Sequence, residues 1–171
     1  MTTLVVYETM YGRTREVAEA VARGCEAGGD VRLVEVSELV AGDGHGALPD
    51  DVTLLVVGGP THAFSMTRPG TRSDATKYGR TVSRTGVREW LATLTLPAGL
   101  PVAAFCTKLD SPLSGSAARA IAQRLRKLGG RSVAAAADFY VKGTQPVLLA
   151  GELDRARAWG ATLVAPVAAG R

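Results

Sequence analysis

Alternating strand-like and helix-like segments predict a doubly wound α/β fold for this chain of 171 residues. The strand-like segments are short, continuous apolar runs, as in strands that are buried on both faces of a parallel sheet. The helix-like segments carry apolar residues every three or four positions, which places them on one helix face. No linker or internal repeat interrupts this alternation, so we expect residues 1–171 to form a single domain with helices on both faces of its sheet.

Five apolar runs are the expected strands of this sheet. The third run is expected to end abruptly at Gly58-Gly59-Pro60, because glycine and proline interrupt strands. The five runs lie at Leu4–Tyr7, Val31–Val36, Leu54–Val57, Val102–Phe105 and within Ser132–Val141.

Four helices are expected between and after these strands. We predict that Glu38–Val40 forms at most a short additional helix before the loop Ala41–Asp51. Thr61–Thr85 is expected to be a long polar segment. The four helices are expected at Gly12–Gly28, near Val87–Leu94, from the capping residue Ser116 to Gly129, and at about Gly151–Val164.

Positive charge is concentrated in one part of the chain. The formal net charge is +4, from 20 Lys and Arg against 16 Asp and Glu. Between Arg68 and Arg88 there are six basic residues and one acidic residue, so this segment carries +5 and the remainder −1. The segment is either a docking surface for an acidic redox partner, a clamp for the phosphates of a nicotinamide nucleotide, or a solvated insertion. Nucleic-acid binding is disfavoured because aromatic residues make up only 5% of the chain.

Several functional classes are excluded by what the sequence lacks. No run of 18 apolar residues and no signal peptide is present, so we expect neither a membrane span nor secretion. The two cysteines, Cys25 and Cys106, suit a reducing cytoplasm. Together with His45 and His62 they show no metal-ligand spacing, so no metal site is expected. A P-loop motif, a dinucleotide-binding glycine motif and the acidic residues of a receiver domain are also missing.

Three loops are candidates for a ligand site, since doubly wound sheets bind ligands beyond the carboxyl ends of their strands. They are Glu8–Thr14, Gly58–Met66 and Cys106–Gly115. In the first loop, Thr9, Gly12 and Thr14 precede a helix whose unpaired N–H groups favour an anion such as a phosphate monoester. Ordinary helix capping by threonine explains the same residues equally well.

The run from Val5 to Thr14, with Ala18 and Val21 after it, resembles the flavodoxin signature. Gly58-Gly59-Pro60-Thr61-His62 is similar to the second flavin loop of that family, and Gly151–Gly160 is similar to its C-terminal segment. The resemblance implies a five-stranded parallel sheet of order 2-1-3-4-5 and noncovalently bound FMN. It implies that the cofactor is bound by Thr9, Met10, Tyr11, Gly12, Arg13, Thr14, Pro60, Thr61, His62, Ala63, Phe64, Cys106, Thr107, Lys108 and Asp110.

The resemblance implies electron transfer through the flavin, with no side chain needed as acid or base. The loop Cys106–Pro112 departs from the family because it has no aromatic residue and offers Lys108 instead. If Lys108 points at the flavin, its charge would raise the reduction potential and favour an NAD(P)H- or quinone-linked reductase or oxidase. If the missing aromatic wall prevents flavin binding, the chain is a flavin-free binding domain, and in each case a monomer or dimer is expected. Without the resemblance, His62 is interpreted as an exposed loop residue, Phe64 as a cover for the sheet edge, Cys106 as structural and Lys108 as a solvated surface lysine.

Overall fold

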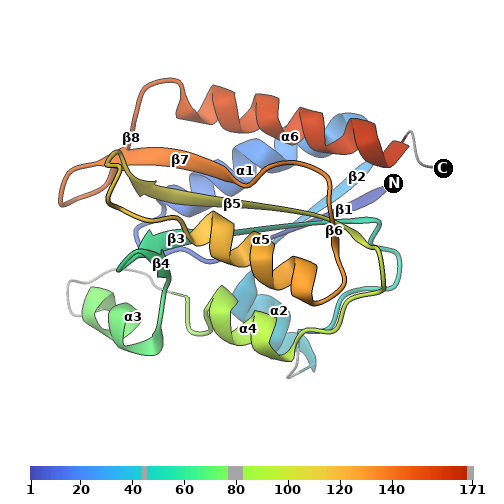
Figure 1. Cartoon of the computed structure of the whole chain (residues 1–171), viewed down its shortest axis with the longest axis horizontal. Coiled ribbons are helices and arrows are strands. Elements are labelled where there is room, and N and C mark those ends of the chain that lie inside the picture. Colours follow the sequence, from blue (N-terminus) through green and yellow to red (C-terminus); the bar gives the residue numbers. More distant parts are fainter. Residues whose placement is uncertain (44–45, 77–82, 169–171) are drawn as a thin grey trace.

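The computed structural model describes residues 1–43, 46–76 and 83–168, with a twisted, mainly parallel sheet between two layers of helices (Figure 1). The parallel strands are arranged in the order β2-β1-β3-β5-β7, which confirms the predicted order 2-1-3-4-5. Three two-residue strands join this sheet: β4 pairs with β3, β6 with β5 and β8 with β7. The bounds are β1 Thr2–Tyr7, β2 Asp30–Glu35, β3 Leu54–His62, β4 Ser65–Met66, β5 Pro101–Leu109, β6 Arg131–Ser132, β7 Ala137–Lys142 and β8 Val147–Leu148.

Helices cover both faces of the sheet, as the sequence predicts (Figure 1). Helices α1 and α6 pack together on one face, while α2, α4 and α5 bury their apolar side chains against the other. The bounds are α1 Arg13–Cys25, followed by a 3₁₀ turn at Glu26–Gly28, α2 Val36–Asp43, α3 Pro69–Thr76, α4 Val87–Thr93, α5 Ala117–Lys127 and α6 Glu152–Ala168.

Strand β3 is longer than predicted. It continues through Gly58-Gly59-Pro60 to His62, so the expected end at this motif is wrong. Gly58 pairs with Phe105 of β5, and a Cβ on Gly58 would lie 2.0 Å from Phe105 Cζ. The glycine therefore makes room for an aromatic ring of the core and does not end the strand.

Helix α2 also differs from the prediction. It begins at Val36, the last residue of the predicted second strand, and it continues to Asp43, within the predicted loop Ala41–Asp51. The Glu35 carboxylate accepts a hydrogen bond from the Ser37 backbone N–H at 3.1 Å, so it satisfies one of the N–H groups that a helix leaves unpaired.

Helix α3 was not predicted, because the segment from Thr61 to Thr85 is polar and has no apolar stripe. The Thr71 hydroxyl accepts a hydrogen bond from the Arg68 N–H at 3.0 Å at the start of this helix. His45 and two of the six basic residues of Arg68–Arg88, Lys77 and Arg80, lie outside the described residues.

Candidate functional site

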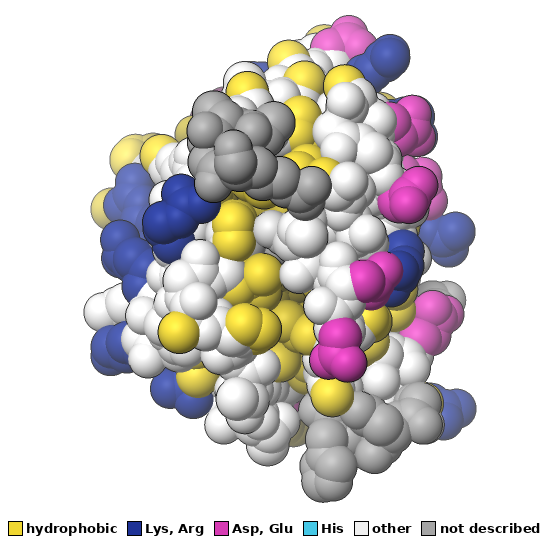
Figure 2. Space-filling view, turned by 90° about the vertical axis from the view of Figure 1, so that its right-hand side faces the viewer, with side chains coloured by type: hydrophobic (Ala, Val, Ile, Leu, Met, Phe, Trp, Pro, Cys, Tyr) yellow, Lys and Arg dark blue, Asp and Glu magenta, His cyan; other side chains and the backbone are white. Residues whose placement is uncertain are grey.

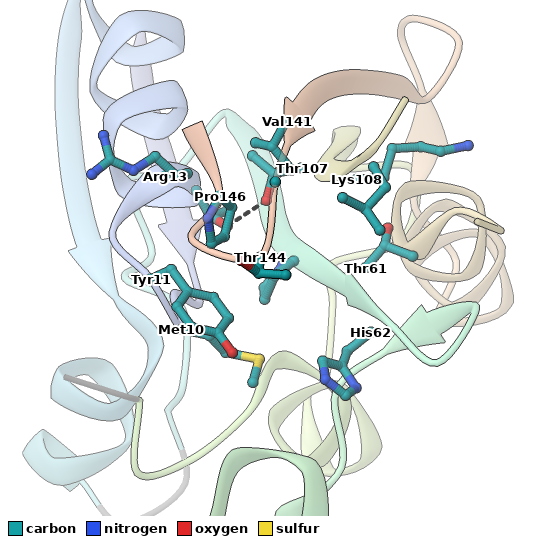
Figure 3. A pocket seen from close by; sticks show the side chains of 14 residues that line it. Met10, Tyr11, Arg13, Thr61, His62, Thr107, Lys108, Val141, Thr144 and Pro146 are labelled. Carbon is teal, nitrogen blue, oxygen red and sulfur yellow. Dashed lines mark hydrogen bonds between the residues drawn. The ribbon is translucent and has the colours of Figure 1, made fainter. Parts of the chain in front are cut away.

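A cavity of about 270 Å³ opens at the carboxyl ends of β1, β3 and β5, where the strand order reverses (Figure 3). This is the position at which doubly wound sheets bind their ligands. Nine of the fifteen predicted site residues line it: Met10, Tyr11, Arg13, Thr14, Pro60, Thr61, His62, Thr107 and Lys108. Five further residues, all from the ends of β5 and β7 and the turn between β7 and β8, complete the lining: Leu109, Val141, Gly143, Thr144 and Pro146.

The first loop owes its shape to hydrogen bonds among its own residues and Ser83. Gly12 has a φ of 82°, and its N–H donates to Thr9 Oγ1 at 3.0 Å. The Thr9 N–H donates to Ser83 Oγ at 3.1 Å, while the Ser83 N–H donates to the Thr9 carbonyl at 3.2 Å. Thr9 and Gly12 therefore fix the path of the loop without lining the cavity themselves.

The N-terminus of α1 supplies donors at one end of the cavity. The N–H groups of Arg13, Thr14 and Arg15 precede the first hydrogen bond of the helix, which Glu16 donates to the Gly12 carbonyl at 3.1 Å. The hydroxyls of Thr14 and Thr107 are 2.8 Å apart (Figure 3). Arg13 Nε is buried and has no hydrogen-bond partner within the described part of the chain. This end of the cavity is therefore suited to an anion.

The second loop is a tight hairpin between β3 and β4. His62 pairs with Ser65, and the turn residues Ala63 and Phe64 have φ values of 48° and 74°. Two successive positive φ angles are typical of the primed turns that join hairpin strands. His62 Nδ1 is buried without a hydrogen-bond partner among the described residues, and its side chain lies beside the cavity (Figure 3). Ala63 and Phe64 are absent from the lining, and the Phe64 side chain is 71% exposed. Their flavin contacts remain a prediction.

The predicted third loop, Cys106–Gly115, begins as strand, because β5 continues past Phe105 to Leu109. Cys106 therefore lies on β5, behind the cavity wall. Its thiol is fully buried, and this burial raises its pKa to about 11. The thiol accepts a hydrogen bond from Thr61 Oγ1 at 3.2 Å and lies 3.1 Å from Asp138 Oδ1. Cys106 is thus part of a polar cluster beneath the site, and Asp110 lies outside the lining with an exposed side chain.

Lys108 lines the cavity but does not direct its charge into it. Its ammonium extends away from Met10 and His62 (Figure 3). Lys108 Nζ lies 3.8 Å from Asp138 Oδ2. Lys108 therefore does not point into the proposed flavin site in this structure, whereas the prediction of a raised reduction potential requires that it does.

Aromatic and apolar side chains form the remaining walls. Tyr11 lies across the cavity from Thr61 and provides an aromatic side chain from the first loop (Figure 3). Pro60, Val141 and Pro146 add apolar surface. The site therefore combines a donor-rich end at α1 with an apolar end that can hold a flat ring system.

Solved structures share the fold of this chain over nearly its whole length, although no family model and no curated protein sequence matches it. A flavodoxin from the domain Archaea is 20% identical with a TM-score of 0.65, covering 98% of this chain and 99% of its own. Oxidised flavodoxin 1 from Bacillus cereus is 13% identical with a TM-score of 0.67, covering 96% and 97%. A WrbA-like flavodoxin protein from Agrobacterium tumefaciens is 19% identical with a TM-score of 0.63, covering 99% of both chains. The chain has a flavodoxin-like fold.

In this flavodoxin-like fold, the basic segment Arg68–Arg88 is partly used inside the molecule. Arg72 is buried, and its guanidinium lies 3.8 Å from Glu8 Oε1 and 3.0 Å from Glu89 Oε2. Arg88 donates to the backbone carbonyls of Thr67 and Met66 at 3.0 and 2.9 Å. These two residues therefore attach the segment to the sheet.

Glu8 anchors the same segment, a role that no sequence pattern indicates because Glu8 resembles an ordinary loop residue. Its carboxylate is 1% exposed, accepts from the Val87 N–H at 2.9 Å and from the Thr67 hydroxyl, and lies next to Arg72. Burial raises the pKa of the Glu8 carboxyl above its ordinary value, against the opposing hydrogen bonds and the charge of Arg72.

Charges outside the site are also unevenly distributed. Figure 2 shows the end of the molecule opposite the cavity, with Lys and Arg gathered on its left and Asp and Glu, among further Lys and Arg, on its right. The last turn of α5 is basic, with Arg124, Arg126 and Lys127. Within residues 1–43, 46–76 and 83–168, no group of three or more His, Cys, Asp or Glu is placed to hold a metal ion. Over the same ranges, no helix has both the length and the apolar character needed to cross a membrane.

Proposed function

We propose that this chain binds FMN noncovalently and transfers electrons through it. The observation that carries the proposal is the cavity at the strand-order reversal, with hydrogen-bond donors at one end and apolar walls at the other. The flavodoxins among the structural neighbours support the same assignment.

The residues present fit the phosphate of FMN. A Cβ on Gly12 would meet nothing within 4 Å, so the backbone there is open to a ligand. The N–H groups at the start of α1 and the Thr14 hydroxyl would hold the phosphate oxygens. The guanidinium of Arg13 pairs with Glu16, so Arg13 would contribute positive charge near the phosphate without being its main ligand.

The residues at the other end fit the isoalloxazine ring. Tyr11 would provide a flat wall, and Pro60, Val141 and Pro146 would exclude water. The unpaired His62 Nδ1 would find a polar partner at the edge of the ring. Bound FMN supplies the electron-transfer chemistry, while these residues bind and orient it and none acts as an acid or base.

An electron carrier remains our proposal over a flavin-dependent reductase or oxidase. The argument for a reductase required Lys108 to face the flavin, whereas its ammonium pairs with Asp138 at 3.8 Å. The argument for a flavin-free domain is that Cys106–Pro112 has no aromatic residue, and against it Tyr11 of the first loop lines the cavity.

The proposed partner is a redox protein, with NAD(P)H or a quinone as the alternative. Of the six basic residues in Arg68–Arg88, Arg72 and Arg88 are engaged inside the molecule. Arg68 and Arg84 have exposed side chains, so docking on the described part of this segment would depend on these two. A cytoplasmic location is part of the proposal, supported by the two free, buried thiols Cys25 and Cys106. We expect a monomer or dimer.

The proposal is tested by the absorption spectrum of the purified protein. We expect flavin absorbance that denaturation releases as free FMN, and reduction of the bound flavin by dithionite. Steady-state oxidation of NADH or NADPH with quinone acceptors then separates a carrier from a reductase, since only a reductase turns over. Protein that is colourless and remains so after incubation with FMN contradicts the proposal.

A further inference from the structure

A polar cluster beneath the cavity connects three strands with the start of α5. It consists of Thr61 on β3, Cys106 and Lys108 on β5, Asp138 on β7 and the α5 capping residue Ser116. We propose that Asp138 is a positioning residue that keeps the charge of Lys108 away from bound FMN. The inference rests on the proposed function.

The Asp138 carboxylate is held firmly on one of its oxygens. Oδ1 accepts a hydrogen bond from Ser116 Oγ at 2.6 Å and from Cys106 Sγ at 3.1 Å. Ser116 is fixed in turn, because its hydroxyl accepts from the Arg119 N–H at 3.2 Å as the cap of α5. The carboxylate therefore cannot follow Lys108 if the lysine side chain moves.

The other oxygen of Asp138 faces Lys108. Lys108 Nζ lies 3.8 Å from Oδ2, and the two side chains are 10% and 15% exposed. Because both are largely removed from water, their attraction is weakly screened by solvent and salt. The pair therefore keeps the ammonium beside Asp138.

The charge of the cavity lining shows why this matters for a flavin. The lining contains two cations, Arg13 and Lys108, and no carboxylate. Reduced FMN gains negative charge relative to oxidised FMN, so an unpaired cation beside the ring stabilises the reduced form. With Asp138 in place, Lys108 is part of a neutral pair, and its effect on the flavin is largely cancelled.

The test is a double-mutant cycle in the reduction potential of bound FMN, using Asp138→Asn, Lys108→Met and the double variant. Asp138→Asn leaves the Lys108 charge unpaired, and we expect the ratio of affinities for reduced over oxidised FMN to rise about tenfold. Lys108→Met leaves the Asp138 charge unpaired and should lower the same ratio about tenfold. The double variant should return to within about threefold of the wild type. A tenfold change corresponds to about 30 mV for a two-electron couple.

Lys142→Met serves as the matched control, since Lys142 is an exposed lysine at the end of β7. Its removal should leave the potential unchanged, because an exposed charge is screened. Opposite shifts of the two single variants support the inference, since loss of structure alone would move both in one direction or neither.

Shifts of the same sign, or no shift in either single variant, overturn the inference while FMN binding stands. If Asp138→Asn fails to fold, Lys108→Met against Lys142→Met decides, and a potential that is unchanged or raised in Lys108→Met overturns the inference. Absence of FMN binding by the wild type overturns the proposed function and this inference with it.

Discussion

The two ends of the cavity are built in different ways. The α1 end is the start of one helix, with Arg13 and Thr14, whose backbone N–H groups are the donors. The opposite end is assembled from β3, β5 and the β7–β8 turn, and its polar groups are fixed by side-chain hydrogen bonds between distant residues. The donors at the α1 end therefore depend only on the backbone conformation of neighbouring residues, whereas the surroundings of the opposite end depend on contacts between strands that are distant in the sequence.

Thr14 tests the α1 end with the largest expected effect. Thr14→Leu replaces a buried hydroxyl at the phosphate end with a larger apolar group. We expect FMN binding to weaken by about 100-fold or more, because a hydrogen bond to a charged group contributes about 1.5–3 kcal/mol and the added bulk occupies the site. Fluorescence titration with FMN measures the affinity.

Thr107→Val is the matched control for this change. It removes the β5 hydroxyl that lies 2.8 Å from the Thr14 hydroxyl but keeps the side-chain shape. We expect a loss of about tenfold or less. Equal losses in the two variants would contradict the assignment of Thr14 to the phosphate.

Arg72 tests whether the basic segment is anchored through its contact with the buried Glu8. Arg72→Met leaves the buried Glu8 without its cation, and we expect the free energy of unfolding to fall by about 3–5 kcal/mol. The exposed Arg68→Met should change it by less than about 0.5 kcal/mol. Urea unfolding monitored by circular dichroism measures both. A small effect of Arg72→Met would show that the segment is not anchored through this residue.

Gly58 tests the strand that carries the second end. Gly58→Ala forces a Cβ into the Phe105 ring, and we expect a loss of about 1–3 kcal/mol in unfolding free energy. Gly59→Ala is the control, because its Cβ would meet only Ile121 Cδ1, at 3.7 Å. Thermal or urea unfolding distinguishes them, and equal stabilities would mean that the ring moves aside without cost.

Glu8 gives the smallest expected effect, a pH dependence of the free energy of unfolding. Its pKa is raised in the folded state by burial, so the folded protein binds a proton more readily than the unfolded chain. Its contribution to stability is therefore full below the ordinary pKa of a glutamate and is lost as the pH rises to the raised value. Glu8→Gln should flatten this decline in a series of urea unfolding curves across that range. A wild-type stability that rises through the same pH range, relative to the variant, would contradict the burial argument.

The contrast between neighbouring residues at the α1 end and distant residues at the opposite end also explains how much could be predicted from the sequence. The positions of the main strands were predictable, because buried strands are continuous apolar runs, whereas the strand order was implied by the resemblance to flavodoxins. Helix α3 was missed because its residues are polar, and Thr144 and Pro146 were missed because only the folded sheet brings the β7–β8 turn to the cavity. The orientation of Lys108 depends on Asp138, thirty residues later, so no local pattern indicated it.

Binding of the FMN phosphate at the α1 end underlies the proposed function. It is tested most directly by titrating the protein with FMN and with riboflavin, which has the same ring but no phosphate. We predict FMN binding that is at least about 100-fold tighter than riboflavin binding. The N-terminus of α1, Arg13 and Thr14 would interact with the phosphate and not with the ring, so riboflavin would lose these interactions. Equal affinities for the two, or no binding of either, would contradict it.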